Sequence, residues 1–267
     1  MKITRLRRIV LLIIVGLFLS QFLGVKALVG GLSGSVAVWF VKLIDVFAWM
    51  ESLAASQSFT MTAFWAVLPL AVVYLVVGRA FCGWVCPMDY LFELVNRLRG
   101  WKRLSFNVPP SVGYGIAALF IIASVVVEIP VFTNYLSHLT NFFRLLTGGL
   151  FLALDLPVER SVVLYSGAII AGLLVLEAML PRLWCRVLCP VGKLYGIFNK
   201  ISLLRLSFAE GKCARCNICD QVCYMGVEIA RHADEEGLRD SNCIYCGRCV
   251  EGCETRGKLV KMTFRRK

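Results

Sequence analysis

Charged residues are scarce in this chain: Asp, Glu, Lys and Arg make up 17% of its 267 residues, whereas 58% are hydrophobic. This composition, with a mean hydropathy of +0.74, excludes an ordinary soluble domain of this size and predicts a membrane protein. No helix-turn-helix or RNA-binding signature is present, and membrane topology with attraction to anionic lipid is enough to explain the net charge of +12. The lipid bilayer is therefore an expected partner and nucleic acid is not.

A signal-peptidase site is also missing. Basic residues precede the first apolar run, but this run is longer than the core of a typical signal peptide and no Ala-x-Ala-like site follows it. We expect it to be an uncleaved membrane anchor. Three further runs approach the roughly 20 apolar residues that cross a bilayer. The four predicted membrane helices are about 9–25, 59–78, 110–129 and 161–180.

Basic residues are unevenly divided among the predicted loops. Lys and Arg of short loops are retained on the cytoplasmic side of a membrane. We therefore predict a multi-pass protein of the inner (cytoplasmic) membrane with both termini in the cytoplasm. Two apolar segments on the outer side, 33–50 and 134–154, are predicted to be interfacial or re-entrant helices. Of the 29 Lys and Arg residues, the predicted outer loops contain only Lys26, Lys42, Arg144 and Arg160.

The two halves of the membrane region match each other at an offset of 103 residues. Both halves run in the same direction, so the sequence predicts two parallel repeats, about 1–103 and 104–206, that form a transmembrane domain 1–206. An axis along the membrane normal would bring the two C-x3-C-P motifs close together. The matched pairs include Arg79 with Arg182, Cys82 with Cys185, Cys86 with Cys189, Pro87 with Pro190, and Asn96 with Asn199.

Eight of the 12 cysteines form two runs with the spacing C-x2-C-x2-C-x3-C. A [4Fe–4S] cluster needs four thiolates, and three cysteines at this spacing allow one short loop to supply three of them. In the bacterial two-cluster pattern, the fourth cysteine of each run ligates the other cluster. We assign Cys213, Cys216, Cys219 and Cys253 to one cluster, and Cys243, Cys246, Cys249 and Cys223 to the second.

Zinc and disulfides are the alternatives for these eight cysteines. Zinc sites pair two C-x2-C doublets and do not need the third cysteine, and disulfides require an oxidising compartment, which the predicted topology denies. Residues 207–267 are therefore predicted to form a small cytoplasmic α+β domain like a bacterial ferredoxin with two [4Fe–4S] clusters. Its end segments, Leu204–Phe208 and Leu259–Phe264, are expected to pair as strands. The proline that normally follows the fourth cysteine is replaced by Tyr224 and Glu254.

The C-x3-C-P motifs carry a second set of cysteines. Each pair places both sulfurs on one helix face, and the proline after the second cysteine should mark a helix end. Since Arg79 and Arg182 lie one turn earlier, we expect them to favour thiolates. The alternative is that these are buried, inert cysteines. The set predicted to form a redox or metal relay, with an additional metal as one form of it, is Cys82, Cys86, Cys185 and Cys189.

Other titratable residues of the membrane region are further candidates. Glu177 lies inside the fourth predicted helix, where a carboxylate marks either a proton path or a buried ion pair with Arg79 or Arg182. Glu128 and His138 are predicted on the outer side, where they could line a quinone pocket.

Four membrane helices, the motifs Cys82-x3-Cys86-Pro87 and Cys185-x3-Cys189-Pro190, and the two cluster runs together resemble the NapH-like family of membrane quinol dehydrogenases or polyferredoxins, which includes MauN- and NosR-type proteins. The resemblance covers nearly the whole chain. It implies a mainly α, polytopic protein that passes electrons between the membrane quinone pool and a periplasmic or membrane redox partner protein. Whether the chain is itself an enzyme, as a quinol dehydrogenase subunit, or an electron-transfer component stays open. The alternative function is a metal-handling or assembly factor for a respiratory oxidase or reductase that uses its C-x3-C-P motifs.

Overall fold

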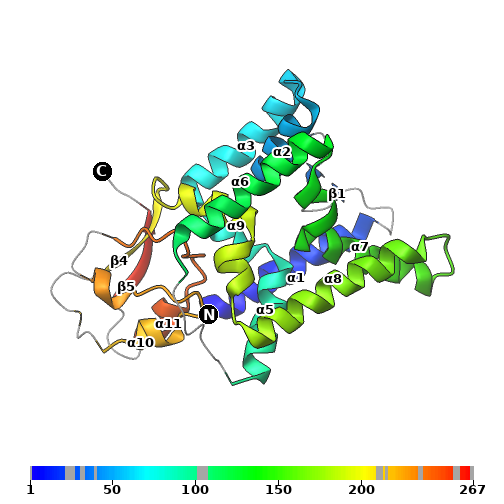
Figure 1. Cartoon of the computed structure of the whole chain (residues 1–267). Coiled ribbons are helices and arrows are strands. Elements are labelled where there is room, and N and C mark those ends of the chain that lie inside the picture. Colours follow the sequence, from blue (N-terminus) through cyan, green and yellow to red (C-terminus); the bar gives the residue numbers. More distant parts are fainter. Residues whose placement is uncertain are drawn as a thin grey trace.

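The computed structural model describes residues 2–21, 28–30, 34–38, 41–100, 108–208, 213, 216–233, 237–254 and 259–264. The described chain is mainly helical (Figure 1). Long helices fill one side of the molecule, and a smaller C-terminal lobe with two strands and short helices lies on the other side. The first residues of α1 lie beside this lobe, because the amide and hydroxyl groups of Thr4 donate to the Glu251 carboxylate at 2.6–3.1 Å.

Helices are present at all four predicted membrane segments: α1 (Ile3–Ser20), α3 (Met61–Val77), α6 (Pro110–Val127) and α8 (Arg160–Met179). Residues 22–25 of the first predicted span lie outside the described residues. Among the residues described, α8 alone is long and apolar enough to cross a membrane, while α3 and α6 are apolar but shorter. One helix could thus cross a membrane by its length and composition, and the four-span topology stays a prediction.

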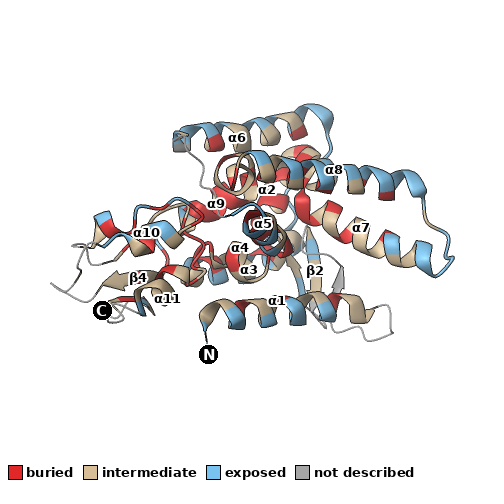
Figure 2. Ribbon diagram, turned by 90° about the horizontal axis from the view of Figure 1, so that it is seen from below, coloured by how far each residue is buried: buried red, intermediate tan, exposed pale blue. Residues whose placement is uncertain are grey.

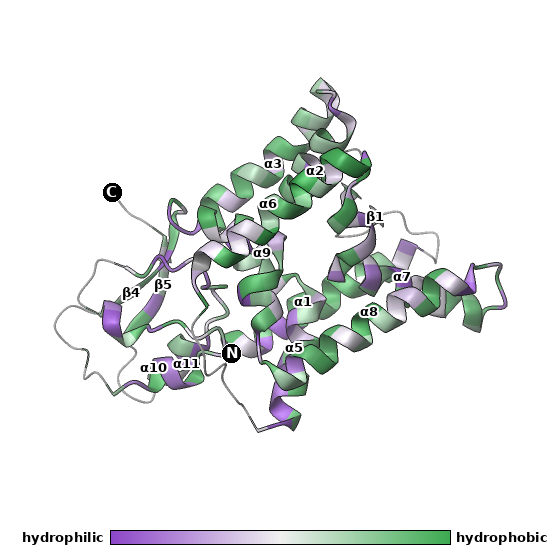
Figure 3. Ribbon diagram, in the orientation of Figure 1, coloured by the Kyte–Doolittle hydropathy of each residue, from purple (hydrophilic) through white to green (hydrophobic). Residues whose placement is uncertain are grey.

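The outer faces of these helices are apolar and exposed. Leu164 on α8 and Val126 on α6 are 73% and 76% exposed, respectively. Figure 2 shows exposed residues along α6 and α8, and Figure 3 shows that the same helices are largely hydrophobic. Large exposed apolar surfaces mark contact with a partner or a membrane, which agrees with the hydropathy of the sequence.

The segment 33–50 was predicted to be an outer helix. Its residues 35–38 and 41–44 instead form strands, which corrects that prediction. Strands β1 (Leu28–Gly30), β2 (Ser35–Val38) and β3 (Val41–Ile44) form an antiparallel sheet. Valine at four of these positions favours extended structure because β-branched side chains suit a pleated sheet. Helix α2 (Val46–Ser56) begins only after Asp45, whose carboxylate accepts the amides of Phe47 and Ala48 at 3.0 and 3.1 Å.

The second outer segment is helical, as predicted. A π-helical turn, Phe132–Leu136, leads into α7 (His138–Ala153), which packs beside α8 (Figure 1). Close approach is possible because Gly148 of α7 has no side chain: an added Cβ would lie 2.5 Å from the Val163 side chain. The short elements that carry the two C-x3-C-P motifs are α4 (Ala80–Trp84), α5 (Pro87–Leu98), a π-helical turn at Trp184–Leu188, and α9 (Pro190–Phe198).

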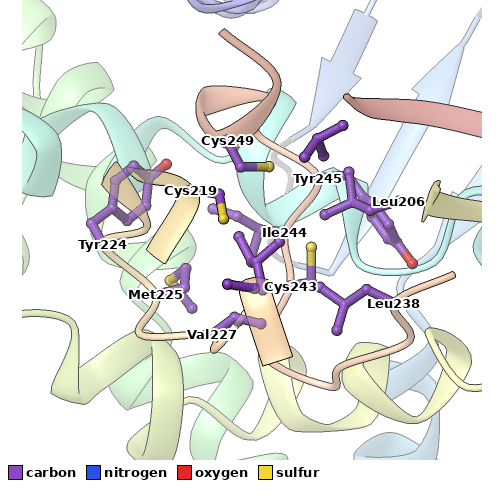
Figure 4. Packing of buried hydrophobic residues seen from close by; sticks show 13 residues of the cluster. Leu206, Cys219, Tyr224, Met225, Val227, Leu238, Cys243, Ile244, Tyr245 and Cys249 are labelled. Carbon is purple, nitrogen blue, oxygen red and sulfur yellow. The ribbon is translucent and has the colours of Figure 1, made fainter. Parts of the chain in front are cut away.

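The C-terminal lobe is a two-stranded sheet with short helices. Strands β4 (Leu204–Phe208) and β5 (Val260–Phe264) pair antiparallel, which confirms the predicted pairing of these end segments. The lobe also contains α10 (Ile218–Val222), a 3-10 turn at Ala230–His232, and α11 (Arg248–Glu254). Its buried core includes three of the cysteines, Cys219, Cys243 and Cys249, together with Leu206 and Ile244 (Figure 4).

The lobe is held directly against the first C-x3-C-P motif. The Trp84 indole donates to the carbonyl of Tyr245 at 2.9 Å, and the backbone of Gly83 touches the carbonyl of Ile244 so closely that a Cβ would not fit. The neighbouring motif residue Ala80 packs against the core of the lobe. The lobe and the helices that carry this motif therefore pack directly against each other.

Replacing Gly83 tests this close approach. In Gly83→Ala, the added methyl group meets a backbone carbonyl, so we expect stability to fall by about 1–3 kcal/mol, seen as a lower midpoint of thermal unfolding in detergent. Gly172→Ala in α8 is the matched control, because nothing lies within 4 Å of its added Cβ. That change should raise stability by about 0.5–1 kcal/mol through helix propensity. Equal effects of the two substitutions would contradict the proposed contact.

Candidate functional site

The cysteine runs of the C-terminal lobe wrap around left-handed turns. Asn217 and Gly247 follow the second cysteine of each run and have φ angles of +57° and +78°. Asn and Gly adopt this region at low cost, because Gly has no Cβ and Asn has a short polar side chain. The turn directs the third cysteine of each run, Cys219 or Cys249, back toward the others, and helices α10 and α11 begin there.

The cysteines of the two runs mix in space. Cys223 comes from the first run, yet it lines one cavity together with Cys243, Cys246 and Cys249 of the second run. Cys219 lies close enough to both Cys213 and Cys249 for their charges to interact. Figure 4 shows the side chains of Cys219 and Cys249 next to each other in the core of the lobe. The cavity brings together the same four residues that the sequence assigned to the second cluster.

The cysteine side chains of this lobe are suitable ligands for iron–sulfur clusters, which are held by cysteine thiolates. Burial raises the pKa of Cys219 to about 12 and also raises the pKa values of Cys243 and Cys249. Metal ligation deprotonates such thiols. In the described part of the chain, no group of three or more Cys, His, Asp or Glu side chains is arranged as the ligand set of a single ion. The fit therefore rests on the donor set and on the shared cavity.

Each C-x3-C-P motif is a helix break. Cys86 and Cys189 are the residues before helices α5 and α9, and Pro87 and Pro190 occupy the first helical position, where a missing N–H costs nothing. The Cys189 sulfur accepts the amide of Gly192 at 3.4 Å. The proline thus ends one short helix and starts the next, as the sequence predicted.

The structure brings the two motifs together. Arg79 of the first motif donates to the carbonyl of Cys185 in the second. Cys82 and Cys185 both pack against the core of the C-terminal lobe, whereas Cys86 packs with Leu139 of α7 and with α8. Cys82 also lies near Cys86 and Cys189. We call Cys82, Cys86, Cys185 and Cys189 the four-cysteine site.

The motif arginines lower the pKa values of the nearby thiols, as expected, but burial outweighs them, so thiolates are not favoured overall. Burial is the largest effect and raises the pKa values of all four thiols, that of Cys189 to about 12. Arg79 lowers the pKa of Cys82 and Arg182 lowers that of Cys185, but by less than burial raises them. The physical reason is desolvation: a thiolate loses more by leaving water than it gains from one nearby cation.

Arg182 is the centre of a buried ion network. Its guanidinium binds Asp89 at 2.5 Å and lies 3.6 Å from Glu177, and its centre is 4.0 Å from the centroid of the Tyr224 ring. The Tyr224 hydroxyl donates to Asp89 at 3.3 Å. Glu177 therefore sits in a buried ion pair, one of the two roles expected for it. Tyr224, which replaces a proline of ferredoxins, fastens the C-terminal lobe to the helices.

His138 is buried beside the first C-x3-C-P motif, and its place at the outer side of the membrane stays a prediction. Its Nε2 lies 3.7 Å from the Cys86 sulfur, and its Nδ1 accepts the Trp184 indole N–H at 3.3 Å. Burial lowers the pKa of His138 to about 4, so the imidazole is neutral. The sequence named His138 only for a quinone pocket and did not predict its contact with Cys86, and it missed Asp89, because neither residue belongs to a spaced motif. The scarcity of histidine, with two in the chain, was the available signal.

Comparisons with known proteins agree with these observations. A family model described as a 4Fe-4S binding domain matches residues 58–105 and 163–208, and each matched segment contains one C-x3-C-P motif. The ferredoxin-type protein NapH of Escherichia coli K12 is 30% identical over 93% of this chain and 85% of its own length. The methylamine utilization ferredoxin-type protein MauN of Methylorubrum extorquens is 28% identical over 82% of this chain and 73% of its own. An uncharacterised protein of Methanocaldococcus jannaschii is 33% identical, with coverages of 72% and 68%.

No solved structure matches the chain at a significant level. The similarity to NapH extends over both motifs and both cysteine runs, since it covers almost all of this chain. The chain therefore belongs to the NapH-like family of ferredoxin-type iron–sulfur electron-transfer proteins.

Proposed function

We propose that this protein passes electrons between a membrane quinone and a periplasmic or membrane redox partner by way of two [4Fe–4S] clusters. The observation that carries the proposal is the position of the four-cysteine site. It lies between the core of the C-terminal lobe, which touches Cys82 and Cys185, and the core of helices α7 and α8, which touches Cys86. A redox or metal relay at this place would join the membrane region to the clusters.

The lobe offers one ligand set for each cluster: Cys213, Cys216, Cys219 and Cys253, and Cys243, Cys246, Cys249 and Cys223. When bound, such clusters accept and release single electrons at potentials that hydrogen bonds and burial adjust. The chain's own part is to hold the lobe against the motifs. Tyr224 on Arg182 and the Trp84 bond to Tyr245 provide that contact.

An apolar cavity of about 450 Å³ supports exchange with a hydrophobic quinone. It lies between α3, the first motif and the sheet of the C-terminal lobe. Its walls include Val77 of α3, Phe81 and Trp84 of the motif, and Phe264 of β5. A molecule bound there would touch the first C-x3-C-P motif and the lobe at once, which is a position suited to electron exchange.

A multi-pass arrangement with both termini in the cytoplasm is part of the proposal. The contact of Thr4 with Glu251 supports it, because the start of α1 and the C-terminal lobe must then lie on one side of the membrane. A metal-handling or assembly role is less well supported, since Cys86 and Cys189 are only 8% and 5% exposed and are poorly placed to hand an ion to another protein.

Iron content tests the cluster assignment. Protein purified without oxygen should contain about eight irons and eight sulfides from two cubane clusters. Cys246→Ser and Cys216→Ser should each remove one cluster signal from the EPR spectrum and disturb the other. Stoichiometric zinc in place of iron would overturn the assignment.

Filling the apolar cavity tests the quinone proposal. Val77→Phe should raise the concentration of a short-chain quinol needed for half-maximal cluster reduction by about tenfold, which corresponds to about 1.4 kcal/mol of lost binding. Reduction by dithionite should be unchanged. Val126→Phe is the control, because this residue lies on the exposed face of α6. If the two substitutions act alike, quinol does not bind in this cavity.

Reporter fusions test the topology. Fusions after residue 267 should be active only as cytoplasmic reporters, and fusions near Gln57 and Leu156 only as exported reporters, because the basic residues concentrate on one side. An exported reporter at the C-terminus would contradict the cluster assignment as well, since the cysteines would then face an oxidising compartment.

A further inference from the structure

Helix α5 buries its charged face and exposes its apolar one. Tyr90, Leu94 and Leu98 are 38%, 42% and 81% exposed. Since these residues are four apart, they form one stripe along the helix. Asp89 and Glu93, on the opposite face, are only 4% and 2% exposed and bind buried arginines. A helix that borders water has the reverse pattern, so the exposed face of α5 is suited to an apolar surrounding.

The second repeat has the same feature at equivalent positions. The offset of 103 residues places Leu94 on Ile197 and Leu98 on Ile201. Ile197 lies in α9 and Ile201 just beyond its end, and they are 44% and 59% exposed. Single exposed apolar residues are normal on any protein. An exposed pair that recurs in register in both repeats indicates instead a surface that both repeats use.

The two helices begin at the C-x3-C-P motifs. Cys86 and Cys189 directly precede α5 and α9, and the prolines that follow them occupy the first helical positions. Figure 1 shows that α5 runs across the direction of α1 and α8. A helix that turns away from the long apolar helices and carries an apolar stripe can lie in the plane of a membrane surface, with this stripe buried about 5–10 Å deep.

Basic residues accompany both apolar pairs. Arg97 and Arg99 are exposed at the end of α5, and Lys200 is exposed beside Ile201. The guanidinium of Arg8 lies 5.9 Å from the centroid of the Tyr90 ring. Cations beside an apolar face match the phosphate headgroups and acyl chains of anionic lipid. A symmetric contact between two copies through α5 would instead bring these like charges together.

We propose that α5 and α9 are a matched pair of in-plane helices that bind the cytoplasmic leaflet of the membrane. Leu94, Leu98, Ile197 and Ile201 contact acyl chains, and the basic residues beside them contact anionic headgroups. The choice of leaflet rests on the topology in the proposed function. Because each helix starts at a motif cysteine, the pair fixes the depth of the four-cysteine site near the boundary between headgroups and acyl chains, which a membrane quinone can reach.

Photocrosslinking of the full-length protein tests the apolar contact. The photoreactive residue p-benzoylphenylalanine is placed at Leu98 or at Ile201, and the protein is irradiated in nanodiscs of phosphatidylcholine and phosphatidylglycerol. Mass spectrometry should find the protein with one phospholipid attached for both positions. The same residue at Val126, which is 76% exposed on α6, should also capture lipid. At Arg231 of the C-terminal lobe, where the side chain is 78% exposed, it should capture none.

The outcomes separate this proposal from the proposed function. Lipid adducts at Val126 without adducts at Leu98 or Ile201 would overturn the in-plane pair and leave the function intact. Crosslinks from these two positions to a second copy of the chain would also overturn it. If Val126 captures no lipid either, insertion of the long helices is contradicted as well.

Removing charge beside the stripe tests the headgroup contact. Arg97→Gln combined with Arg99→Gln should lower the ratio of phosphatidylglycerol to phosphatidylcholine among the lipids captured at position 98 by about fivefold or more, because each basic residue near an anionic surface attracts it. Arg231→Gln, on the exposed surface of the lobe, is the control and should leave this ratio unchanged. An unchanged ratio in the double variant would contradict the contact with anionic headgroups.

Discussion

A buried guanidinium must be matched by acceptors or opposite charge, and the two motif arginines stand at the junction of helices and C-terminal lobe in this protein. Arg182 and Arg79 are both at most 1% exposed. Arg182 holds Asp89, Glu177 and the Tyr224 ring in one network. Arg79 joins the carbonyls of Cys185 and Ser241, which belong to the second motif and to the lobe. Breaking such contacts leaves an unpaired charge in a dry interior, so each arginine fixes several elements at once.

Duplication explains why the two arginines exist, and divergence explains their different surroundings. The repeat places equivalent helix breaks at Cys86-Pro87 and Cys189-Pro190, and the structure brings them together. Asp89 of the first repeat pairs with Arg182 of the second repeat, whereas Gly192, the counterpart of Asp89, lies against Arg79 of the first repeat. Arg182 therefore acts as a structural clamp on Tyr224, while Arg79 donates to the carbonyls of Cys185 and Ser241.

Much of this arrangement could be predicted from spacing. The paired cysteine runs indicated an iron–sulfur domain, the family resemblance is confirmed, and strands β4 and β5 pair as expected. These features depend on local periodicity or on fixed spacing. Strands β2 and β3, at 35–44, were predicted to be part of a helix over 33–50, because a short apolar run with interruptions does not distinguish a strand from a helix.

The contacts between residues far apart in the chain could not be predicted from the sequence. His138 reaches Cys86 only because α7 starts deep among the helices, and no local pattern reports that depth. Thiolates were expected from the nearby arginines, but charge spacing in a sequence says nothing about desolvation, which dominates at Cys185 and Cys189. The role of Asp89 depends on the buried Arg182 that it binds, and the sequence does not show that Arg182 is buried.

The central claim is that electrons travel between membrane and clusters through the four-cysteine site. The most direct test mixes the anaerobic full-length protein with a short-chain quinol, freezes samples at increasing times and follows the EPR signals of the reduced clusters. The claim predicts that Cys82→Ser and Cys185→Ser slow this reduction by about tenfold or more, while dithionite still reduces both clusters. Reduction at the rate of the unchanged protein in both variants would contradict it.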